Sequence, residues 1–465
     1  MSIGIRRPWE AVNYQELVRS FPPPPEYFER AYYASPEEID RIKLSRVADR
    51  AQRAQAVPFF RERWAAADFE PRDIRSLDDL KFVPTYTVDD IRLSIEAHPP
   101  AGNYQGIELG DALREPMRVH MSGGSTGEPR PTLYTQWDRE VGGVLTARGA
   151  YMQGLRPGDV VLNSWSYGLH NGAFAFDEAL HRWLNCIVIT TSTGNVTSTR
   201  KQVELAKHYK AAGILTTGDY LLRIVEEARS MGLDPKEDLS IRSLATNVGN
   251  EKELSALFGI PAFQTYGFHE VQYVSVECEA KGGLHIFEDA FHIDVVDPET
   301  GEPLPDGETG ALVVTELYKT GSPQFRYNIM DLASLHPREQ CACGSWLRRM
   351  SPFAGRGDNM VKLRGVNVWP EALGEIAASV GGASTDYVVT AVRAGNRDEM
   401  KISVATDIDP GDRENLRLSI EKRIQEKLGV SISAVVVGTG EIDHLTKIET
   451  SPKPIRFRDE RQDRT

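Results

Sequence analysis

The sequence predicts an α/β protein with a large N-terminal unit and a small C-terminal α+β domain. Its 465 residues exceed what one hydrophobic core usually holds, so at least two packed units are expected. In the middle of the chain, short β-branched runs alternate with helix-like segments, which is typical of βαβ units. The last stretch of about a hundred residues mixes helix and strand patterns and is long enough for an independent domain.

The first part of the chain is mostly helical in pattern. Residues 37–63 contain charged and alanine-rich runs with apolar residues at three- and four-residue spacing. Four prolines at 22–25 interrupt this region, where a rigid surface connection is favoured over a polyproline II ligand.

The middle of the chain predicts a parallel sheet and a β-rich subdomain. Runs at 160–163, 186–189 and 212–215 are apolar, β-branched and followed by helix-like segments, so we expect them to be strands of βαβ units. Residues 293–335 predict several strands separated by turns, such as the Pro-Asp-Gly turn at 305–307.

The C-terminal domain is predicted from its alternating patterns. Helices are expected at 371–378 and 414–428, and strands at 387–394, 401–406 and 430–437.

The composition is that of an ordinary globular protein. Apolar residues make up 40%, charged residues 26%, and the formal net charge is −13 at pH 7. This negative charge argues against general nucleic-acid binding, which needs a basic surface. The first residues lack the apolar run of a signal peptide, and no stretch approaches the roughly 18 apolar residues of a membrane span. We expect a cytoplasmic protein with no membrane partner.

The most informative segment is the Met-Ser-Gly-Gly-Ser-Thr-Gly-Glu-Pro run at 121–129, which follows a strand-like stretch at 117–120. Its glycines let the backbone approach a ligand, and its hydroxyls can donate to phosphate oxygens. The Gly-Lys-Ser/Thr ending of a Walker A loop is absent. Taken alone, such a run is a polar turn about as often as it is a ligand site.

Other segments of the chain indicate which kind of ligand site this run belongs to. It resembles the phosphate loop of the adenylate-forming superfamily, which includes acyl-CoA synthetases, nonribosomal adenylation domains and luciferases. Further segments match in the proper order, and the whole chain, including 57–63 and 74–80, resembles the phenylacetate-CoA ligase branch. The matching segments are Tyr167-Gly168-Leu169-His170-Asn171-Gly172, Gly249-Asn250-Glu251, Tyr266-Gly267-Phe268-His269-Glu270, Arg326-Tyr327-Asn328-Ile329-Met330-Asp331-Leu332, Gly355-Arg356-Gly357-Asp358-Asn359-Met360 and Arg364-Gly365-Val366-Asn367-Val368-Trp369-Pro370.

The resemblance implies the adenylate-forming enzyme fold. Residues 1–357 would form the ATP- and acid-binding unit, and residues 358–465 a small mobile domain that follows a hinge at Asp358. The implied cofactors are ATP, Mg²⁺ and coenzyme A. The implied pyrophosphate-side loop residues are Ser122, Gly124, Ser125, Thr126 and Gly127.

The nucleotide would be held by residues of the other motifs. The resemblance implies that Tyr266 packs on adenine, that Asp331 accepts from the ribose hydroxyls, and that Glu270 binds Mg²⁺. The remaining ATP-site residues implied by the motifs are Gly249, Asn250, Glu251, Gly267 and Arg356.

A lysine near the C-terminus is the implied catalytic cation. Residues 450–456 (Thr-Ser-Pro-Lys-Pro-Ile-Arg) resemble the region whose lysine stabilises the adenylation transition state, which assigns Lys453. A solvated tail lysine is the competing interpretation.

Three residues depart from the family pattern. Glu128 replaces a lysine of the phosphate loop, so that contact must be lost or supplied elsewhere. His269 replaces a hydroxyl residue, although an imidazole can still donate to a phosphate oxygen, and we count it as catalytic. Pro452 replaces a glycine and stiffens the loop before Lys453.

Three cysteines and a histidine predict a structural zinc site. Cys278, His285, Cys341 and Cys343 supply the thiolate and imidazole ligands of a closed tetrahedral centre, with His336 as an alternative fourth ligand. Cys-x-Cys spacing is tighter than the common Cys-x2-Cys, so ordinary reduced cysteines stay open.

Aromatic side chains around the acid-pocket motif favour an aryl or arylalkyl carboxylic acid as the small-molecule substrate. Core packing is the alternative for some of them. The predicted acid-binding residues are Tyr134, Trp165, Tyr167, His170, Asn171, Gly172 and Phe174.

The predicted function is that of an AMP-forming aryl-CoA ligase. Two other functions stay open: an adenylating enzyme that passes the acyl group to a free-standing carrier-protein thiol or an amine, and a non-catalytic nucleotide-binding homologue. The family resemblance suggests a homodimer.

Overall fold

The chain forms two compact units, which are described separately. The computed structural model describes residues 4–122, 129–246, 250–359, 361–363, 366–394, 397–447 and 454–461. The first unit comprises Met1–Ile329 and Ser334–Pro352, and the second comprises Met330–Ala333 and Phe353–Thr465. Among the described residues, no helix has the length and apolar character needed to cross a membrane.

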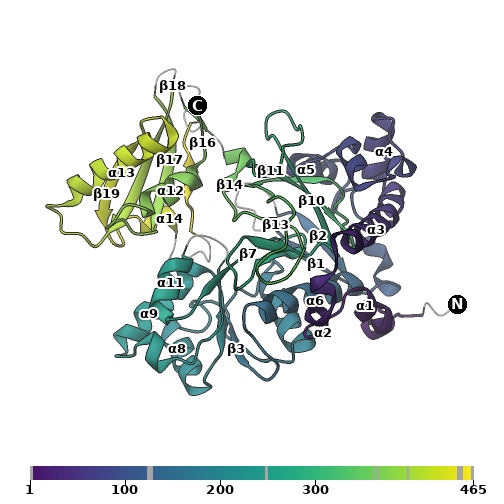
Figure 1. Cartoon of the computed structure of the whole chain (residues 1–465), viewed down its shortest axis with the longest axis horizontal. Helices are drawn as coiled ribbons and strands as arrows, with labels where there is room; N and C mark the ends of the chain where they lie inside the picture. Colours follow the sequence, from purple (N-terminus) through teal and green to yellow (C-terminus); the bar gives the residue numbers. More distant parts are fainter. Residues whose placement is uncertain are drawn as a thin grey trace. The chain divides into compact units, whose positions relative to one another are not determined.

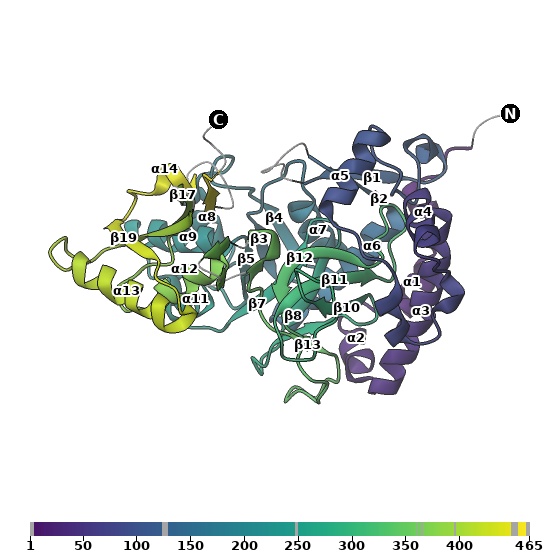
Figure 2. The ribbon, with the colours of Figure 1, turned by 90° about the horizontal axis from the view of Figure 1, so that it is seen from above.

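Helices α1, α3 and α4 gather at one side of the first unit (Figures 1 and 2). Ser35 caps α3 by accepting a hydrogen bond from Glu38 N. Pro58 is the first residue of α4, so the helical stretch predicted at 37–63 is divided into two helices. The N-terminal helices are α1 (Tyr14–Ser20), α2 (Glu26–Glu29), α3 (Pro36–Ala56), α4 (Pro58–Ala66) and α5 (Val88–Ala97).

A three-stranded parallel sheet lies at the centre of the predicted βαβ region. Its strands are β3 (Val160–Asn163), β4 (Ile187–Thr190) and β5 (Gly213–Leu215), in the order β4-β3-β5. The helices of this region are α6 (Gln136–Met152), α7 (Gly172–Glu178), α8 (Thr199–His208), α9 (Gly218–Ser230) and α10 (Pro235–Asp238).

A second sheet of the first unit carries the hairpin on which the site is built. Its order is β13-β9-β8-β7-β6, and β7 pairs antiparallel with β8. Its strands are β6 (Leu244–Thr246), β7 (Ala262–Phe268), β8 (Gln272–Glu277), β9 (Leu284–Ile286) and β13 (Arg349–Met350), and helix α11 (Glu251–Phe258) connects β6 to β7.

Two further antiparallel pairs complete the strands of the first unit. Strands β1 (Met117–Met121) and β2 (Pro131–Thr135) flank the predicted phosphate loop, and β10 (Phe291–Val296) pairs with β11 (Gly310–Glu316) in the predicted β-rich stretch. Strand β12 (Tyr327–Ala333) carries the chain from one unit into the other. A short π-helix lies at Ala179–Trp183, and short 3-10 helices lie at Pro8–Glu10, Ala31–Tyr33, Pro71–Asp73, Leu77–Phe82 and Leu109–Leu113, with a further one in the second unit at Gly357–Asn359.

The second unit is an α+β domain with the sheet order β19-β18-β17-β20. Side chains alternate across this sheet: Val389 and Ile402 join a core with helices α12 and α13, whereas Val388 packs with Ile442 in a separate cluster. The elements are β14 (Gly355–Arg356), β15 (Val361–Leu363), β16 (Val366–Val368), α12 (Pro370–Ala378), β17 (Tyr387–Ala394), β18 (Arg397–Thr406), α13 (Arg413–Leu428), β19 (Ser433–Gly438), α14 (Asp443–Thr446) and β20 (Phe457–Asp459). The predicted α/β class with its C-terminal α+β domain is confirmed.

Candidate functional site

The two ends of the predicted phosphate loop are tied together. Ser122 N donates to Arg130 O over 3.1 Å, and Arg130 N donates to the Ser122 hydroxyl over 3.0 Å. These bonds continue the β1–β2 ladder beyond the Met121–Pro131 pair. The predicted loop residues Gly124, Ser125, Thr126 and Gly127 lie outside the described residues, as do Glu128, Gly249, Pro452 and Lys453.

Residues 269–271 form the turn of the β7–β8 hairpin, so His269 and Glu270 project from its tip. The hairpin is tight at Gly267, where a Cβ atom would lie 1.9 Å from Gln272 O. A register shift between Tyr266 and Gly267 marks a β-bulge, a device that re-aims neighbouring side chains. Tyr266 itself is buried on β7.

The Glu270 carboxylate is buried and pairs with a cation that sequence reasoning missed. Arg130 Nη2 donates to Glu270 Oε1 over 3.2 Å. Burial raises the pKa of Glu270, but His269 and Arg130 together lower it below its usual value of 4.5. Arg130 supplies a cation two residues beyond Glu128, where the family pattern expects a lysine.

His269 is neutral at physiological pH. Burial, together with the nearby cations Lys319 and Arg130, lowers the pKa of His269 to about 4, although Glu270 opposes this shift. Above that pH the Glu270 carboxylate keeps Arg130 as its ion-pair partner, while His269 carries no charge. Within the described part of the chain, His269 Nε2 has no hydrogen-bond partner, so it is available to a ligand oxygen.

Aromatic rings extend from this hairpin toward the predicted acid pocket. The ring of His120, on β1, lies 5.6 Å from the Tyr134 ring and 5.3 Å from the Phe174 ring. Phe174 in turn makes an edge contact with Tyr167, with ring centres 5.3 Å apart. Burial lowers the pKa of His120 to about 4, so this ring is also neutral. His120 was not predicted, because a single histidine in a strand carries no distinctive sequence signal.

The polar atoms of two predicted acid-binding residues bond within the protein. The Tyr134 hydroxyl donates to His269 O over 2.5 Å. The Tyr167 hydroxyl accepts from Asn163 Nδ2 over 2.9 Å. Tyr134 is buried, so of the two only the half-buried Tyr167 has ring surface left for a ligand.

Three of the remaining predicted acid-binding residues lie at the start of α7, and Trp165 follows β3. Gly172 N donates to His170 Nδ1 over 3.1 Å, and buried Asn171 occupies the cap position of the helix. Trp165 stacks on Phe176, with ring centres 5.7 Å apart, and packs against a hydrophobic core cluster, as the core-packing alternative expected.

Asn250 and Glu251 begin helix α11 in the first unit. Asn250 Nδ2 donates to Asp219 Oδ1 over 3.0 Å, which ties the start of α11 to the first turn of α9.

The other predicted nucleotide residues belong to the second unit. Asp331 on β12 is the register partner of Arg356 on β14, and Arg356 Nη1 donates to Asp331 Oδ1 over 3.0 Å. Arg356 also donates to both carboxylate oxygens of Asp358, over 2.8 and 2.6 Å. One guanidinium thus links the predicted ribose ligand to the predicted hinge residue.

The predicted zinc ligands converge. The ligand atoms of Cys278, His285, Cys341 and Cys343 all lie within 4.8 Å of one another, and the cysteines are free thiols. Zn–S and Zn–N bonds of about 2.3 and 2.0–2.1 Å give tetrahedral edges of about 3.8 Å (S···S) and about 3.6 Å (S···N). The Cys278–Cys341 sulfur separation is 3.7 Å, and Cys343 Sγ lies 3.6 Å from His285 Nε2, so these two edges fit a zinc ion.

The cluster also has the electrostatics and surroundings of a metal site. A hydrogen bond from Cys278 lowers the pKa of Cys343, which favours the thiolate form that a metal binds. The Tyr32 hydroxyl lies 3.1 Å from Cys343 Sγ, a second contact that the sequence did not reveal. The alternative ligand His336 is not part of this group.

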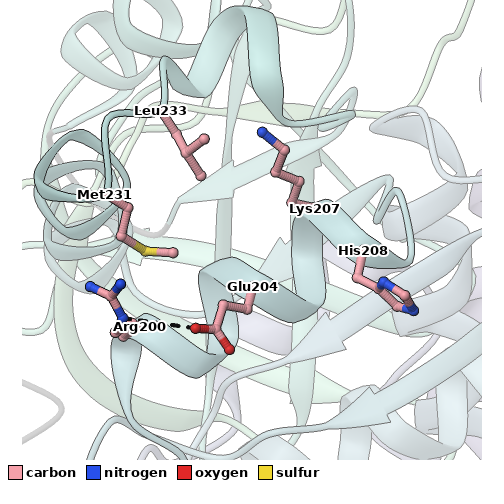
Figure 3. A pocket seen from close by; sticks show the side chains of 6 residues that line it. All are labelled: Arg200, Glu204, Lys207, His208, Met231 and Leu233. Carbon is pink, nitrogen blue, oxygen red and sulfur yellow. Dashed lines mark ion pairs between the residues drawn. The ribbon is translucent and has the colours of Figure 1, made fainter.

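A shallow hollow in the first unit is lined by α8 and by the segment that follows α9. Figure 3 shows Met231 and Leu233 facing it, with an Arg200–Glu204 ion pair at its edge. It contains none of the predicted site residues.

Comparison with known proteins decides the family. The chain is 32% identical over 401 residues to a phenylacetate-coenzyme A ligase of Pseudomonas putida, covering 83% of this chain and 87% of the relative. The chain belongs to the phenylacetate-CoA ligase family. A second family member, from Aromatoleum evansii, is 31% identical over 438 residues and covers 91% of this chain and 96% of the relative. The predicted family is confirmed.

Two further comparisons agree with the fold. Residues 365–461 match the family described as AMP-binding enzyme C-terminal domain. A solved 2-hydroxyisobutyryl-CoA ligase in the postadenylation state superposes with a TM-score of 0.81 at 23% identity, covering 94% of this chain and 92% of that one. At that identity the likeness concerns the fold alone.

Proposed function

We propose that this phenylacetate-CoA ligase family member activates an aryl or arylalkyl carboxylic acid with Mg·ATP and transfers the acyl group to coenzyme A. The observation that carries the proposal is the link that Arg130 makes between the base of the predicted phosphate loop and the Glu270 carboxylate. This link places a cation, Arg130, between the base of that loop and a carboxylate that could serve as a hard metal ligand, and phosphoryl chemistry uses both kinds of group.

The first step joins the acid to the nucleotide. A carboxylate oxygen attacks the α-phosphorus of ATP, the bond to the bridging oxygen of the β-phosphate breaks, and pyrophosphate leaves with both electrons. Glu270 would hold Mg²⁺, which neutralises charge on the phosphates when bound. Arg130 keeps Glu270 ionised, and neutral His269 donates its N–H to a phosphate oxygen.

In the second step, the thiolate sulfur of coenzyme A attacks the acyl carbonyl, and AMP leaves. Coenzyme A is favoured over a carrier protein or an amine because the curated relatives are coenzyme A ligases. The predicted homodimer and carrier partner stay predictions.

An aromatic acid is supported by the rings of His120, Tyr167 and Phe174 beside the hairpin turn. Flat apolar surfaces of this kind contact an aryl ring over a large area. The names of the curated relatives support the same class of acid.

We also assign a structural zinc ion to the cluster of Cys278, His285, Cys341 and Cys343. Four protein ligands leave no open position for a substrate, so this ion would stabilise the fold around β9 and take no part in the reaction.

The test is acid-dependent pyrophosphate release with Mg·ATP, using phenylacetate, benzoate and 2-hydroxyisobutyrate, each with and without coenzyme A. We expect release with the aryl acids, a thioester product only when coenzyme A is present, and a large loss in Lys453→Ala. Release with 2-hydroxyisobutyrate alone would contradict the aromatic assignment, and no release with any carboxylic acid would contradict the function.

A further inference from the structure

Successive backbone carbonyls in the hairpin turn accept hydrogen bonds from buried side chains of other elements. These side chains, which we name the turn clamp, belong to Tyr134 on β2 and to Tyr318 and Lys319 in the segment after β11. The Tyr134 hydroxyl donates to His269 O over 2.5 Å, Lys319 Nζ to Glu270 O over 2.6 Å, and the Tyr318 hydroxyl to Val271 O over 3.2 Å.

The turn clamp fixes the backbone on both sides of Glu270. A peptide unit is planar, so a bond to its carbonyl orients the whole unit. Tyr134 orients the unit before Glu270 and Lys319 orients the unit after it, which restricts both backbone torsions of this residue. The direction of the Glu270 side chain follows from those torsions.

The donors of the turn clamp are themselves held rigidly. Asp138 accepts from Thr320 N over 2.7 Å and from Gly321 N over 2.8 Å, and Glu316 accepts from Lys319 N over 2.7 Å. The segment that carries Lys319 is therefore fixed at the backbone by two buried carboxylates.

Lys319 is also joined to the other donor that orients Glu270. Its ammonium lies 4.0 Å from the centre of the Tyr134 ring, within range of a cation–π interaction. The Lys319 side chain is 1% exposed, so its charge is withdrawn from water. A buried cation is a costly structural element, which suggests that its contact with the turn serves the site.

We propose that Lys319 is a positioning residue for Glu270, acting through the Glu270 backbone carbonyl. The proposal rests on the proposed function, because it takes Glu270 as the Mg²⁺ ligand. Misplacing a reacting or metal-binding group by about 1 Å can cost on the order of 10²-fold in rate. Loss of Lys319 should therefore weaken Mg²⁺ use while leaving the contacts of the acid unchanged.

The experiment compares Lys319→Met with Lys43→Met. Lys43 is the matched control, because it is also a buried ammonium, bound to Glu288 over 2.7 Å. The Mg²⁺ concentration for half-maximal pyrophosphate release, the KM for Mg·ATP and the KM for the acid are measured at a temperature where circular dichroism shows both variants folded. We expect Lys319→Met to raise the Mg²⁺ requirement and the KM for Mg·ATP about tenfold or more, and to leave the acid KM within about twofold.

Lys43→Met should lower thermal stability without changing the Mg²⁺ requirement. A folded Lys319→Met with wild-type Mg²⁺ dependence would overturn the proposal. If Lys319→Met does not fold, Lys319→Arg takes its place, since it keeps a buried cation but cannot set the same single nitrogen against Glu270 O. An unchanged Mg²⁺ requirement in folded Lys319→Arg would overturn the proposal equally.

Failure of the proposed function is distinguishable from failure of this inference. If the wild type releases no pyrophosphate with any acid, calorimetric binding of Mg·ATP becomes the readout. Lys319→Met is then expected to bind Mg·ATP about tenfold more weakly than the wild type, and equal binding would overturn the positioning role.

Discussion

Arg130→Met should destabilise the first unit by an amount that grows with pH. The substitution leaves the Glu270 carboxylate, whose side chain is 8% exposed, without its ion-pair partner. Breaking a buried pair in this way costs about 3–5 kcal/mol when the remaining charge stays in place. Glu270 can escape part of this cost by taking up a proton.

The free-energy cost of protonating Glu270 sets the size of the stability loss in Arg130→Met. Relative to the usual pKa of 4.5, neutralising a carboxyl at pH 7 costs about 1.36 kcal/mol for each of 2.5 pH units, or about 3.4 kcal/mol. At pH 5.5 the same step costs only about 1.4 kcal/mol. The stability deficit of Arg130→Met should therefore fall from about 3 kcal/mol at pH 7 to about 1 kcal/mol at pH 5.5.

The sign follows from the direction of each pKa shift. In the wild type the pKa of Glu270 is lowered, so its contribution is present above the unfolded-state pKa and lost as pH falls. In Arg130→Met the unpaired, buried Glu270 has a raised pKa instead. The loss of folding stability in this variant therefore appears only as the pH rises. Urea denaturation of both proteins at the two pH values measures the difference.

Arg338→Met is the matched control. Arg338 also pairs with a buried carboxylate, that of Glu288, but Glu288 keeps its bond to Lys43. We expect Arg338→Met to lose less folding stability than Arg130→Met, with little dependence of that loss on pH. An Arg130→Met deficit that is equal at pH 5.5 and pH 7 would refute the reasoning.

Three further predictions concern packing, substrate and metal. Gly267→Ala should lower the free energy of unfolding by more than about 2 kcal/mol and lower activity, because its Cβ would meet Gln272 O. Phe174→Ala should raise the KM for an aryl acid about tenfold and leave that for ATP unchanged in steady-state assays, since one aromatic contact provides roughly 1.4 kcal/mol. Cys341→Ser should reduce the zinc content from one ion per chain, measured by elemental analysis, and lower the Tm by at least about 4 °C.

The glycine and cysteine variants each have a control in the same chain. Gly110→Ala places its Cβ in open space and should be nearly neutral, and Cys186→Ser alters a buried cysteine outside the cluster and should keep the zinc. Wild-type stability of Gly267→Ala would contradict the close approach to Gln272 O. An unchanged KM for the aryl acid in Phe174→Ala would contradict the ring contact with the acid, and a full zinc content in Cys341→Ser would contradict its role as a metal ligand.

The sequence was sufficient for features carried by local patterns. Helix α12 and strand β17 lie where the spacing of apolar residues predicted them. The four predicted metal ligands come together although more than 50 residues separate His285 from Cys341, because antiparallel pairing of β9 and β13 closes that distance.

Contacts between segments that are far apart in the chain could not be predicted from sequence patterns. Arg130 gains its role because the β1–β2 hairpin brings it beside Ser122 and aims it at Glu270, which is 140 residues away. Lys319 reads as an ordinary polar residue after a strand, and only the packing of its segment on the hairpin turn reveals its contact. The break between α3 and α4 was not predicted within 37–63, although Pro58 carried the signal for it, because proline cannot continue a helix without loss of a hydrogen bond.

The most direct test of acyl-adenylate chemistry follows an oxygen atom. Phenylacetate labelled with ¹⁸O in both carboxylate positions is turned over with Mg·ATP and coenzyme A, and the AMP is analysed by mass spectrometry. Attack of a carboxylate oxygen on the α-phosphorus, followed by thiol attack at the carbonyl, leaves one ¹⁸O in AMP and the other in the thioester. Unlabelled AMP, or formation of ADP in its place, would contradict the account.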